Sequence, residues 1–117
     1  MNVYYARCMS IYGTPQEKRD LELLRKLGFD VIEISAEEAE TGYKTYGMGY
    51  FTDIITARAD LLAFRALPDG SIPAGVSTEI ACAIEMKKPV IELPSGLQRR
   101  TLSVELTREY LQNVGQR

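Results

Sequence analysis

The order of strand-like and helix-like segments is the feature of this 117-residue chain that most constrains its fold. Short apolar runs typical of buried strands lie at residues 2–6, 29–34, 60–64 and 89–93. Helical spacing of apolar residues marks the segments between them. Strands that alternate with helices form parallel sheets covered by those helices. The sequence therefore predicts an α/β fold, a single domain over residues 1–117 with a doubly wound parallel sheet of four or five strands.

Two helix starts are marked by capping signals. Thr14 and Ser35 are polar capping residues, and each has a glutamate three residues later. The first signal, which also has a proline at the first helical position, predicts a helix that ends at Gly28. The second predicts a short helical turn. Residues 41–49, rich in glycine and tyrosine, are interpreted as a loop that could cover a ligand.

The second half of the chain predicts two further helices and a tail. Apolar residues at helical spacing predict a helix over about 48–58 and another over about 75–88. Residues 101–114 are interpreted as a short edge strand followed by a C-terminal helix around Tyr110. Because doubly wound sheets bind ligands beyond the carboxyl ends of their strands, we expect a ligand crevice at that edge.

Composition excludes several classes of function. The net charge is −2, and lysine and arginine are spread along the chain, so the basic stripe of a nucleic-acid-binding protein is missing. No apolar run approaches the roughly 20 residues that span a membrane, and no signal-peptide pattern opens the chain, so we expect a cytoplasmic protein with no membrane partner.

The absence of histidine restricts the possible chemistry further. The chain has no histidine, and its two cysteines, Cys8 and Cys82, lie far apart in the sequence. Zinc sites of the usual kind, Ser-His-Asp triads and Cys-His dyads all need residues that are missing. The sequence therefore predicts no metal and no cofactor, and it leaves carboxylates, tyrosines or lysines for any catalysis.

The start of the helix predicted at residue 75 is the strongest candidate for a binding site. Backbone N–H groups at a helix start bind anions, and Ser77 and Thr78 add hydroxyl donors near Gly75. We therefore expect a phosphate or another anion there. Glu79 lies in the first predicted turn, where the helix dipole favours an ionised carboxylate. It is interpreted either as a glycosyl-accepting nucleophile or as a surface glutamate that complements the dipole.

Further candidates surround the same crevice. Arg7, just after the first strand, either pairs bidentately with a phosphate or is an ordinary exposed loop arginine. Tyr43, Tyr46 and Tyr50 either stack on a base or serve only in packing. Ser95 follows the fourth strand, so we expect it beside the same crevice.

Two blocks of the sequence resemble the nucleoside 2-deoxyribosyltransferase family. They are Asp60-Leu61-Leu62-Ala63 and Gly75-Val76-Ser77-Thr78-Glu79-Ile80-Ala81-Cys82-Ala83, followed by Lys88-Pro89-Val90-Ile91. The family form is an aspartate that opens strand three, a Gly-x-Gly/Ser-x-Glu helix start and a Lys-Pro-hydrophobic strand four. The likeness covers about residues 2–95 and implies a Rossmann- or flavodoxin-like sheet.

The resemblance implies cleavage of the N-glycosidic bond of a nucleoside or a (deoxy)nucleoside 5′-monophosphate. It implies that Glu79 attacks the anomeric carbon, that Asp60 binds or protonates the base, and that Tyr5 or a neighbouring tyrosine steadies the nucleophile. We expect Glu79 to be ionised at neutral pH and Asp60, at the start of a buried strand, to hold a proton. Because family members are usually homodimers, we also expect a homodimer.

Pro73 separates this chain from the transferase branch of the family. Transferases carry an aspartate six residues before the glutamate, where this chain has Pro73. The nucleotide-hydrolysing branch instead binds the 5′-phosphate with hydroxyls and helix N–H groups, which Gly75, Ser77 and Ser95 could supply. A hydrolase is therefore the preferred expectation. A non-catalytic nucleotide-binding or sensing domain of the same fold is the alternative.

Overall fold

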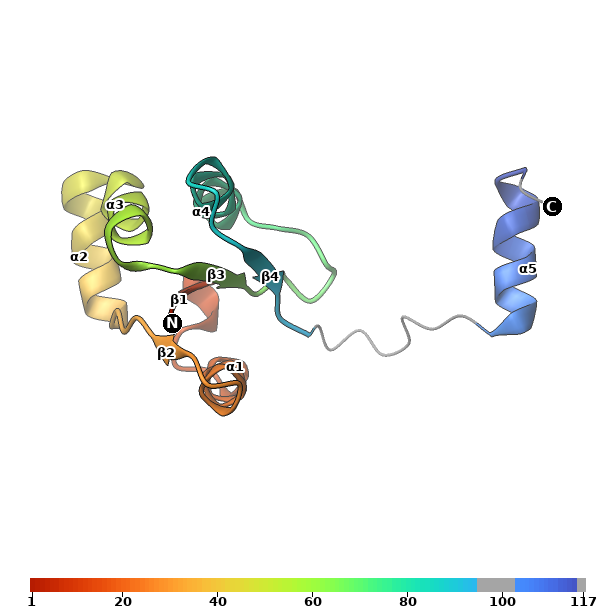
Figure 1. The fold of residues 1–117 in the computed structure, drawn as a ribbon, viewed down its shortest axis with the longest axis horizontal. Helices are drawn as coiled ribbons and strands as arrows, with labels where there is room; N and C mark the ends of the chain where they lie inside the picture. Colours follow the sequence, from red (N-terminus) through yellow and green to blue (C-terminus); the bar gives the residue numbers. More distant parts are fainter. Residues whose placement is uncertain (95–102, 116–117) are drawn as a thin grey trace.

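The computed structural model describes residues 1–94 and 103–115, and its centre is a four-stranded parallel sheet (Figure 1). The strands are β1 (Asn2–Ala6), β2 (Asp30–Val31), β3 (Leu61–Phe64) and β4 (Val90–Glu92), in the order β2-β1-β3-β4. In the parallel register, Val3 of β1 lies opposite both Val31 and Leu61. The predicted α/β fold with a parallel sheet is confirmed.

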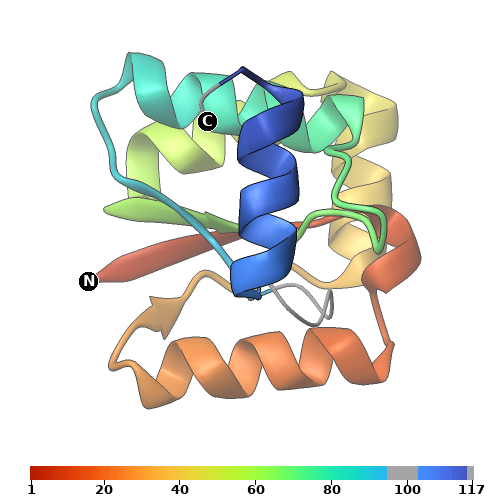
Figure 2. The same ribbon diagram turned by 90° about the vertical axis from the view of Figure 1, so that its right-hand side faces the viewer.

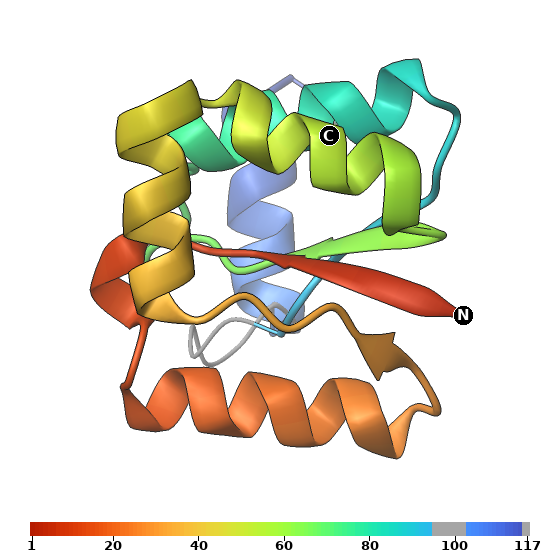
Figure 3. The same ribbon diagram turned by 90° about the vertical axis from the view of Figure 1, so that its left-hand side faces the viewer.

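Helices cover both faces of the sheet, as Figures 1 and 3 show. The helix α1 (Pro15–Lys26) lies on one face, and α2 (Ala36–Tyr46), α3 (Gly49–Arg58) and α4 (Ala74–Glu85) lie on the other. The sheet has a hydrophobic core on each face. The side chains of β1 contribute to both, because successive residues of a strand point to opposite faces. Val3 and Tyr5 pack in the cluster on the α1 face, whereas Tyr4 and Ala6 pack in the cluster on the other.

The capping signals form as the sequence predicts, but α2 is longer than expected. The hydroxyl of Ser35 accepts a hydrogen bond from the N–H of Glu38 at 3.1 Å, which starts α2. The helix then continues to Tyr46, so the loop expected over 41–49 is wrong for most of its length. Gly42 explains the difference: it is buried, and a Cβ atom there would collide with the ring of Tyr50 on α3. This glycine permits close helix packing and does not mark a loop.

The remaining boundaries agree more closely with expectation. β2 has only two residues in the sheet, although Ile32 and Ile34 beyond it are buried in the core. The C-terminal helix is present as α5 (Val104–Asn113), which lies away from the sheet in Figure 1 and stands upright in the foreground of Figure 2. The edge strand expected near residue 101 begins outside the described residues. In the described part of the chain, no helix combines the length and the apolar character needed to cross a membrane.

A buried polar cluster ties α1 to the sheet on the α1 face. The carboxylate of Asp20, whose residue is 2% exposed, accepts hydrogen bonds from the Tyr5 hydroxyl at 2.5 Å and from Arg65 Nε at 2.9 Å. Arg65 also forms an ion pair with the second carboxylate oxygen and donates to the carbonyl of Pro94. The cluster therefore joins α1, β1 and the segments that follow β3 and β4.

Candidate functional site

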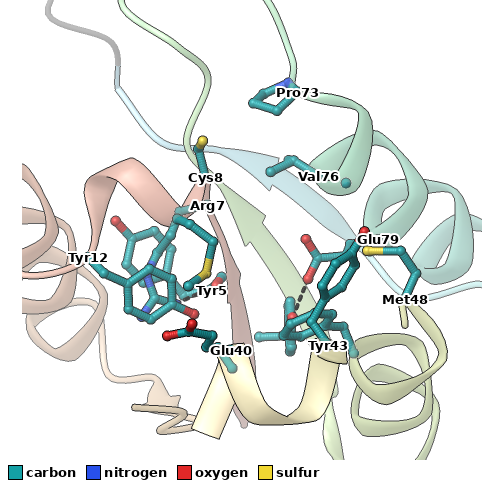
Figure 4. A pocket seen from close by; sticks show the side chains of 15 residues that line it. Tyr5, Arg7, Cys8, Tyr12, Glu40, Tyr43, Met48, Pro73, Val76 and Glu79 are labelled. Atoms are coloured by element: carbon teal, nitrogen blue, oxygen red, sulfur yellow. Dashed lines mark hydrogen bonds between the residues drawn. The ribbon is translucent and has the colours of Figure 1, made fainter. Parts of the chain in front are cut away.

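A cavity of about 350 Å³ lies near the carboxyl end of β1 and is closed by α2, α3 and the start of α4 (Figure 4). Its wall includes the aromatic residues Tyr4, Tyr5, Tyr12, Tyr43 and Phe51. Its volume is in the range of small-molecule sites. β1 has β2 on one side and β3 on the other. The connection to β2 runs through α1 on one face of the sheet, and the connection from β2 to β3 runs through α2 and α3 on the other face. The cavity therefore lies at the topological switch point, where such sheets bind ligands.

Glu79 is the buried carboxylate of this cavity. It extends from α4, its residue is only 6% exposed, and it accepts a hydrogen bond from the hydroxyl of Tyr4 (Figure 4). Burial raises the pKa of Glu79 to about 7, although the Tyr4 hydrogen bond and the charge of Arg7 oppose the rise. Burial also raises the pKa of Tyr4, so its phenol stays protonated and acts as the donor.

The protonation of Glu79 differs from the expectation of a fully ionised carboxylate. α4 begins at Ala74, so Glu79 is its sixth residue and lies in the second turn and not in the first. The helix dipole acts mainly within the first turn, and the loss of hydration outweighs it here. Near neutral pH the folded protein therefore holds Glu79 in both protonation states.

The raised pKa of Glu79 predicts a pH-dependent stability that a Glu79→Gln variant lacks. Folding raises the pKa of Glu79 from 4.5 to about 7. Protonated Glu79 therefore contributes stability that is fully present below pH 4.5 and is lost as the pH rises through about 7. We expect the free energy of unfolding of Glu79→Gln, minus that of wild type, to increase by about 3 kcal/mol between pH 4.5 and 8. Urea unfolding at both pH values measures this difference.

The exposed Glu85 on the same helix provides the control for that comparison. Glu85→Gln removes the same charge from a solvated position, so its stability difference from wild type should stay nearly constant over this range. A constant difference for Glu79→Gln as well would show that Glu79 is not desolvated.

Tyr4, and not Tyr5, is the tyrosine that contacts Glu79. Tyr5 is among the lining residues, but its hydroxyl donates to Asp20 on the opposite face of the sheet. Adjacent strand residues point to opposite faces, so only one of the two hydroxyls can reach α4. The first-strand tyrosine that contacts Glu79 is therefore Tyr4, the neighbour of Tyr5.

Asp60 does not lie beside Glu79. It precedes β3 at the amino end of the strand, is exposed, and accepts a hydrogen bond from the N–H of Asn2 at 2.6 Å. It does not line the cavity. The expected pairing of Asp60 with Glu79, and the expected desolvation of Asp60, are wrong because the amino end of a parallel strand lies at the edge opposite the ligand edge.

The expected anion ligands separate into two groups. Gly75 lines the cavity, whereas Ser77 and Thr78 are exposed and do not. The hydroxyl of Thr78 donates to the carbonyl of Ala74 at 3.1 Å. The N-cap residue of α4, Pro73, makes no side-chain cap hydrogen bond, so the N–H groups of Gly75 and Val76 are donors on the cavity wall that an anion could use. Ser95 lies outside the described residues.

Arg7 is a fixed part of the cavity wall and not an exposed loop residue. Its side chain is 9% exposed, its Nε donates to Glu17 at 3.1 Å, and its Nη1 donates to the carbonyl of Tyr5 at 2.9 Å. The guanidinium lies 4.3 Å from the ring centre of Tyr5 and 3.9 Å from that of Tyr12. Two of its five N–H donors are therefore engaged in holding it in place, and the guanidinium brings positive charge to the cavity wall.

The polar lining residues that were not predicted from the sequence include Tyr12, Glu40 and, as the partner of Glu79, Tyr4. Glu40 was missed because α2 was expected to be a single turn, which placed no helical face against the cavity. Tyr4 could have been predicted from the alternation along β1, because adjacent residues of a strand face different sides and only one of Tyr4 and Tyr5 can face α4.

Comparison with known proteins finds no match: no family model, no curated protein and no solved structure is similar to the chain at a significant level. Within residues 1–94 and 103–115, no group of three or more histidine, cysteine, aspartate or glutamate side chains could hold a metal ion.

Proposed function

We propose that the protein is an N-glycosidase that hydrolyses a (deoxy)nucleoside 5′-monophosphate, with Glu79 as its nucleophile. The observation that carries the proposal is a buried carboxylate, hydrogen-bonded to Tyr4, in an aromatic cavity at the switch point of the sheet. The resemblance to the nucleoside 2-deoxyribosyltransferase family, and to its nucleotide-hydrolysing branch, supplies the substrate class.

In the proposed reaction, Glu79 attacks the anomeric carbon of the sugar while the bond from that carbon to the base nitrogen breaks. The base leaves with the bonding electrons and takes up a proton from solvent. Water then hydrolyses the glycosyl ester on Glu79, so the configuration at the anomeric carbon is retained. Tyr4 donates to the carboxylate and thereby holds it in one orientation. Only the ionised fraction of Glu79 can attack, so activity rises with pH through about 7.

The positive groups of the cavity suit the phosphate of such a substrate. The N–H groups of Gly75 and Val76 at the uncapped start of α4 provide donors, and the guanidinium of Arg7 provides charge from another wall. The aromatic residues leave an apolar surface for the base.

The position of Asp60 favours the second candidate, a non-catalytic nucleotide-binding or sensing domain. With Asp60 outside the cavity, no second buried carboxylate lines it among the described residues. The leaving base would then depend on solvent for its proton. A protein of this kind would bind nucleotides in the same cavity without cleaving them.

The homodimer implied by the family resemblance stays a prediction. Exposed apolar side chains on α5, such as Val104 and Tyr110, provide surface that nothing in the described part of the chain covers. A second copy of the chain is the partner that the resemblance implies.

Incubation of the protein with a panel of nucleosides and their 5′-monophosphates tests the proposed activity. We expect free base and sugar 5-phosphate from at least one deoxynucleoside monophosphate, at a rate that increases between pH 6 and 8. The matching nucleoside should react more slowly, since it lacks the phosphate. Chromatography separates the products. Tight binding of monophosphates without any release of base would establish the binding function instead.

A further inference from the structure

Tyr12 brings to the cavity a hydroxyl group that no other described residue uses. It follows the short 3₁₀ helix η1 (Met9–Ile11), is half-buried, and lines the cavity. The hydroxyls of the two buried tyrosines in the wall, Tyr4 and Tyr5, are already engaged with carboxylates. Among the described residues, the hydroxyl of Tyr12 has no hydrogen-bond partner. It is therefore free to bond a ligand in the cavity.

The guanidinium of Arg7 lies against the ring of Tyr12. The guanidinium carbon is 3.9 Å from the centre of that ring, and Glu17 holds Arg7 in place by accepting from its Nε at 3.1 Å. Burial raises the pKa of Tyr12, although the charge of Arg7 opposes the rise, so the hydroxyl carries its proton at neutral pH. The same charge would stabilise a phenolate if the proton were passed on.

Tyr12 and Glu79 belong to different walls of the cavity, and Figure 4 shows them on opposite sides of it. A retaining hydrolysis needs two such groups, a nucleophile and an acid that flank the bond to be broken. Glu40 cannot be the acid, because the hydrogen bond and charge of Lys44 lower its pKa and keep it ionised. Asp60 lies outside the cavity. The phenol of Tyr12 is a protonated group on the side that the acid would occupy.

Building on the proposed function, we propose that Tyr12 is the acid and the base of the reaction. As Glu79 bonds to the anomeric carbon and the bond from that carbon to the nucleobase breaks, the Tyr12 hydroxyl passes its proton to the nucleobase, in place of solvent. The phenolate then takes a proton from water, whose oxygen bonds to the anomeric carbon as the ester to Glu79 breaks. Both residues thereby return to their starting protonation states.

First-turnover release of base by Tyr12→Phe tests this role. Phenylalanine keeps the ring beside Arg7 and removes only a hydroxyl without a partner, so the fold should persist, as circular dichroism would verify. One substrate is the best monophosphate of the panel. The other carries a base that leaves more easily, N7-methylated for a purine or 5-fluorinated for a pyrimidine. We expect a loss of about a hundredfold on the first substrate and a much smaller loss on the second, because an easily leaving base needs less help from an acid.

The second step gives an independent readout. Without its base, the variant should release one nucleobase per site from the easily leaving substrate and then slow, with the sugar phosphate held on Glu79. Azide, which attacks without a proton transfer, should restore turnover and yield the glycosyl azide. Tyr43→Phe is the matched control: it removes the hydroxyl of another tyrosine in the wall and should keep wild-type rates on both substrates.

The outcomes separate this inference from the proposed function. Equal losses on the two substrates would show that Tyr12 only binds or positions the substrate, and unchanged rates would show that solvent supplies the proton. Either result, or a similar pattern of losses in Tyr43→Phe, would overturn the role of Tyr12 while the proposed function stands on base release by the wild type. Failure of the wild type to release base from every monophosphate would overturn the proposed function itself.

Discussion

The Glu79→Gln variant is expected to release base at least about a thousandfold more slowly than wild type, while remaining folded. Glutamine fills the same space but cannot form the glycosyl ester, and no other buried carboxylate lines the cavity among the described residues. The fold should survive because a neutral amide costs less to bury than an ionised carboxylate. The measurement is base release from the best substrate of the panel at pH 7.5, with circular dichroism to verify folding.

Glu85→Gln is the matched control for this loss. Glu85 lies on the same helix, is exposed, and does not line the cavity, so its removal changes the charge without changing the site. We expect base release near the wild-type rate. Near wild-type activity in Glu79→Gln would mean that another group forms the covalent bond, or that water attacks directly.

Replacement of Asp20 by alanine is expected to lower the free energy of unfolding by about 3–5 kcal/mol, the effect of breaking a buried ion pair. The change would leave the guanidinium of Arg65 and the hydroxyl of Tyr5 without their carboxylate in a region closed to water. Arg65 would retain its bond to the carbonyl of Pro94. Urea unfolding monitored by circular dichroism measures the effect.

Glu22→Ala supplies the comparison for Asp20→Ala. Glu22 lies on α1, two residues from Asp20, but it is exposed, so its loss should change stability by no more than about 0.5 kcal/mol. Should the two variants lose similar stability, the cluster around Asp20 would not be the anchor of α1 that its burial indicates.

The elements near capping signals and buried strands could be predicted from local sequence. The strand Asn2–Ala6 and the helix Pro15–Lys26 follow directly from an apolar run and from a threonine, proline and glutamate at fixed spacing. Gly42 shows the limit of this reasoning. Its role depends on the ring of Tyr50 from the next helix, a contact that no local pattern contains.

The site shows what local pattern and family resemblance each miss. The segment that opens α4 could be placed at the cavity because it follows a strand of a parallel sheet. Asp60 precedes its strand, so the same rule puts it at the far edge. The resemblance suggested otherwise. The pKa of Glu79 could not be predicted, because it depends on burial beneath residues from α2, α3 and β1 that only the tertiary structure brings together.

The covalent intermediate tests the central claim most directly. The wild-type protein is incubated with a 2′-fluorinated deoxynucleoside 5′-monophosphate, which slows the hydrolysis of a glycosyl ester, and is then digested and analysed by mass spectrometry. We predict release of base together with a mass increase of one fluorinated sugar phosphate on the peptide that contains Glu79, at that residue. Release of base with no adduct, or with an adduct on a different residue, would contradict the assignment of Glu79 as the nucleophile.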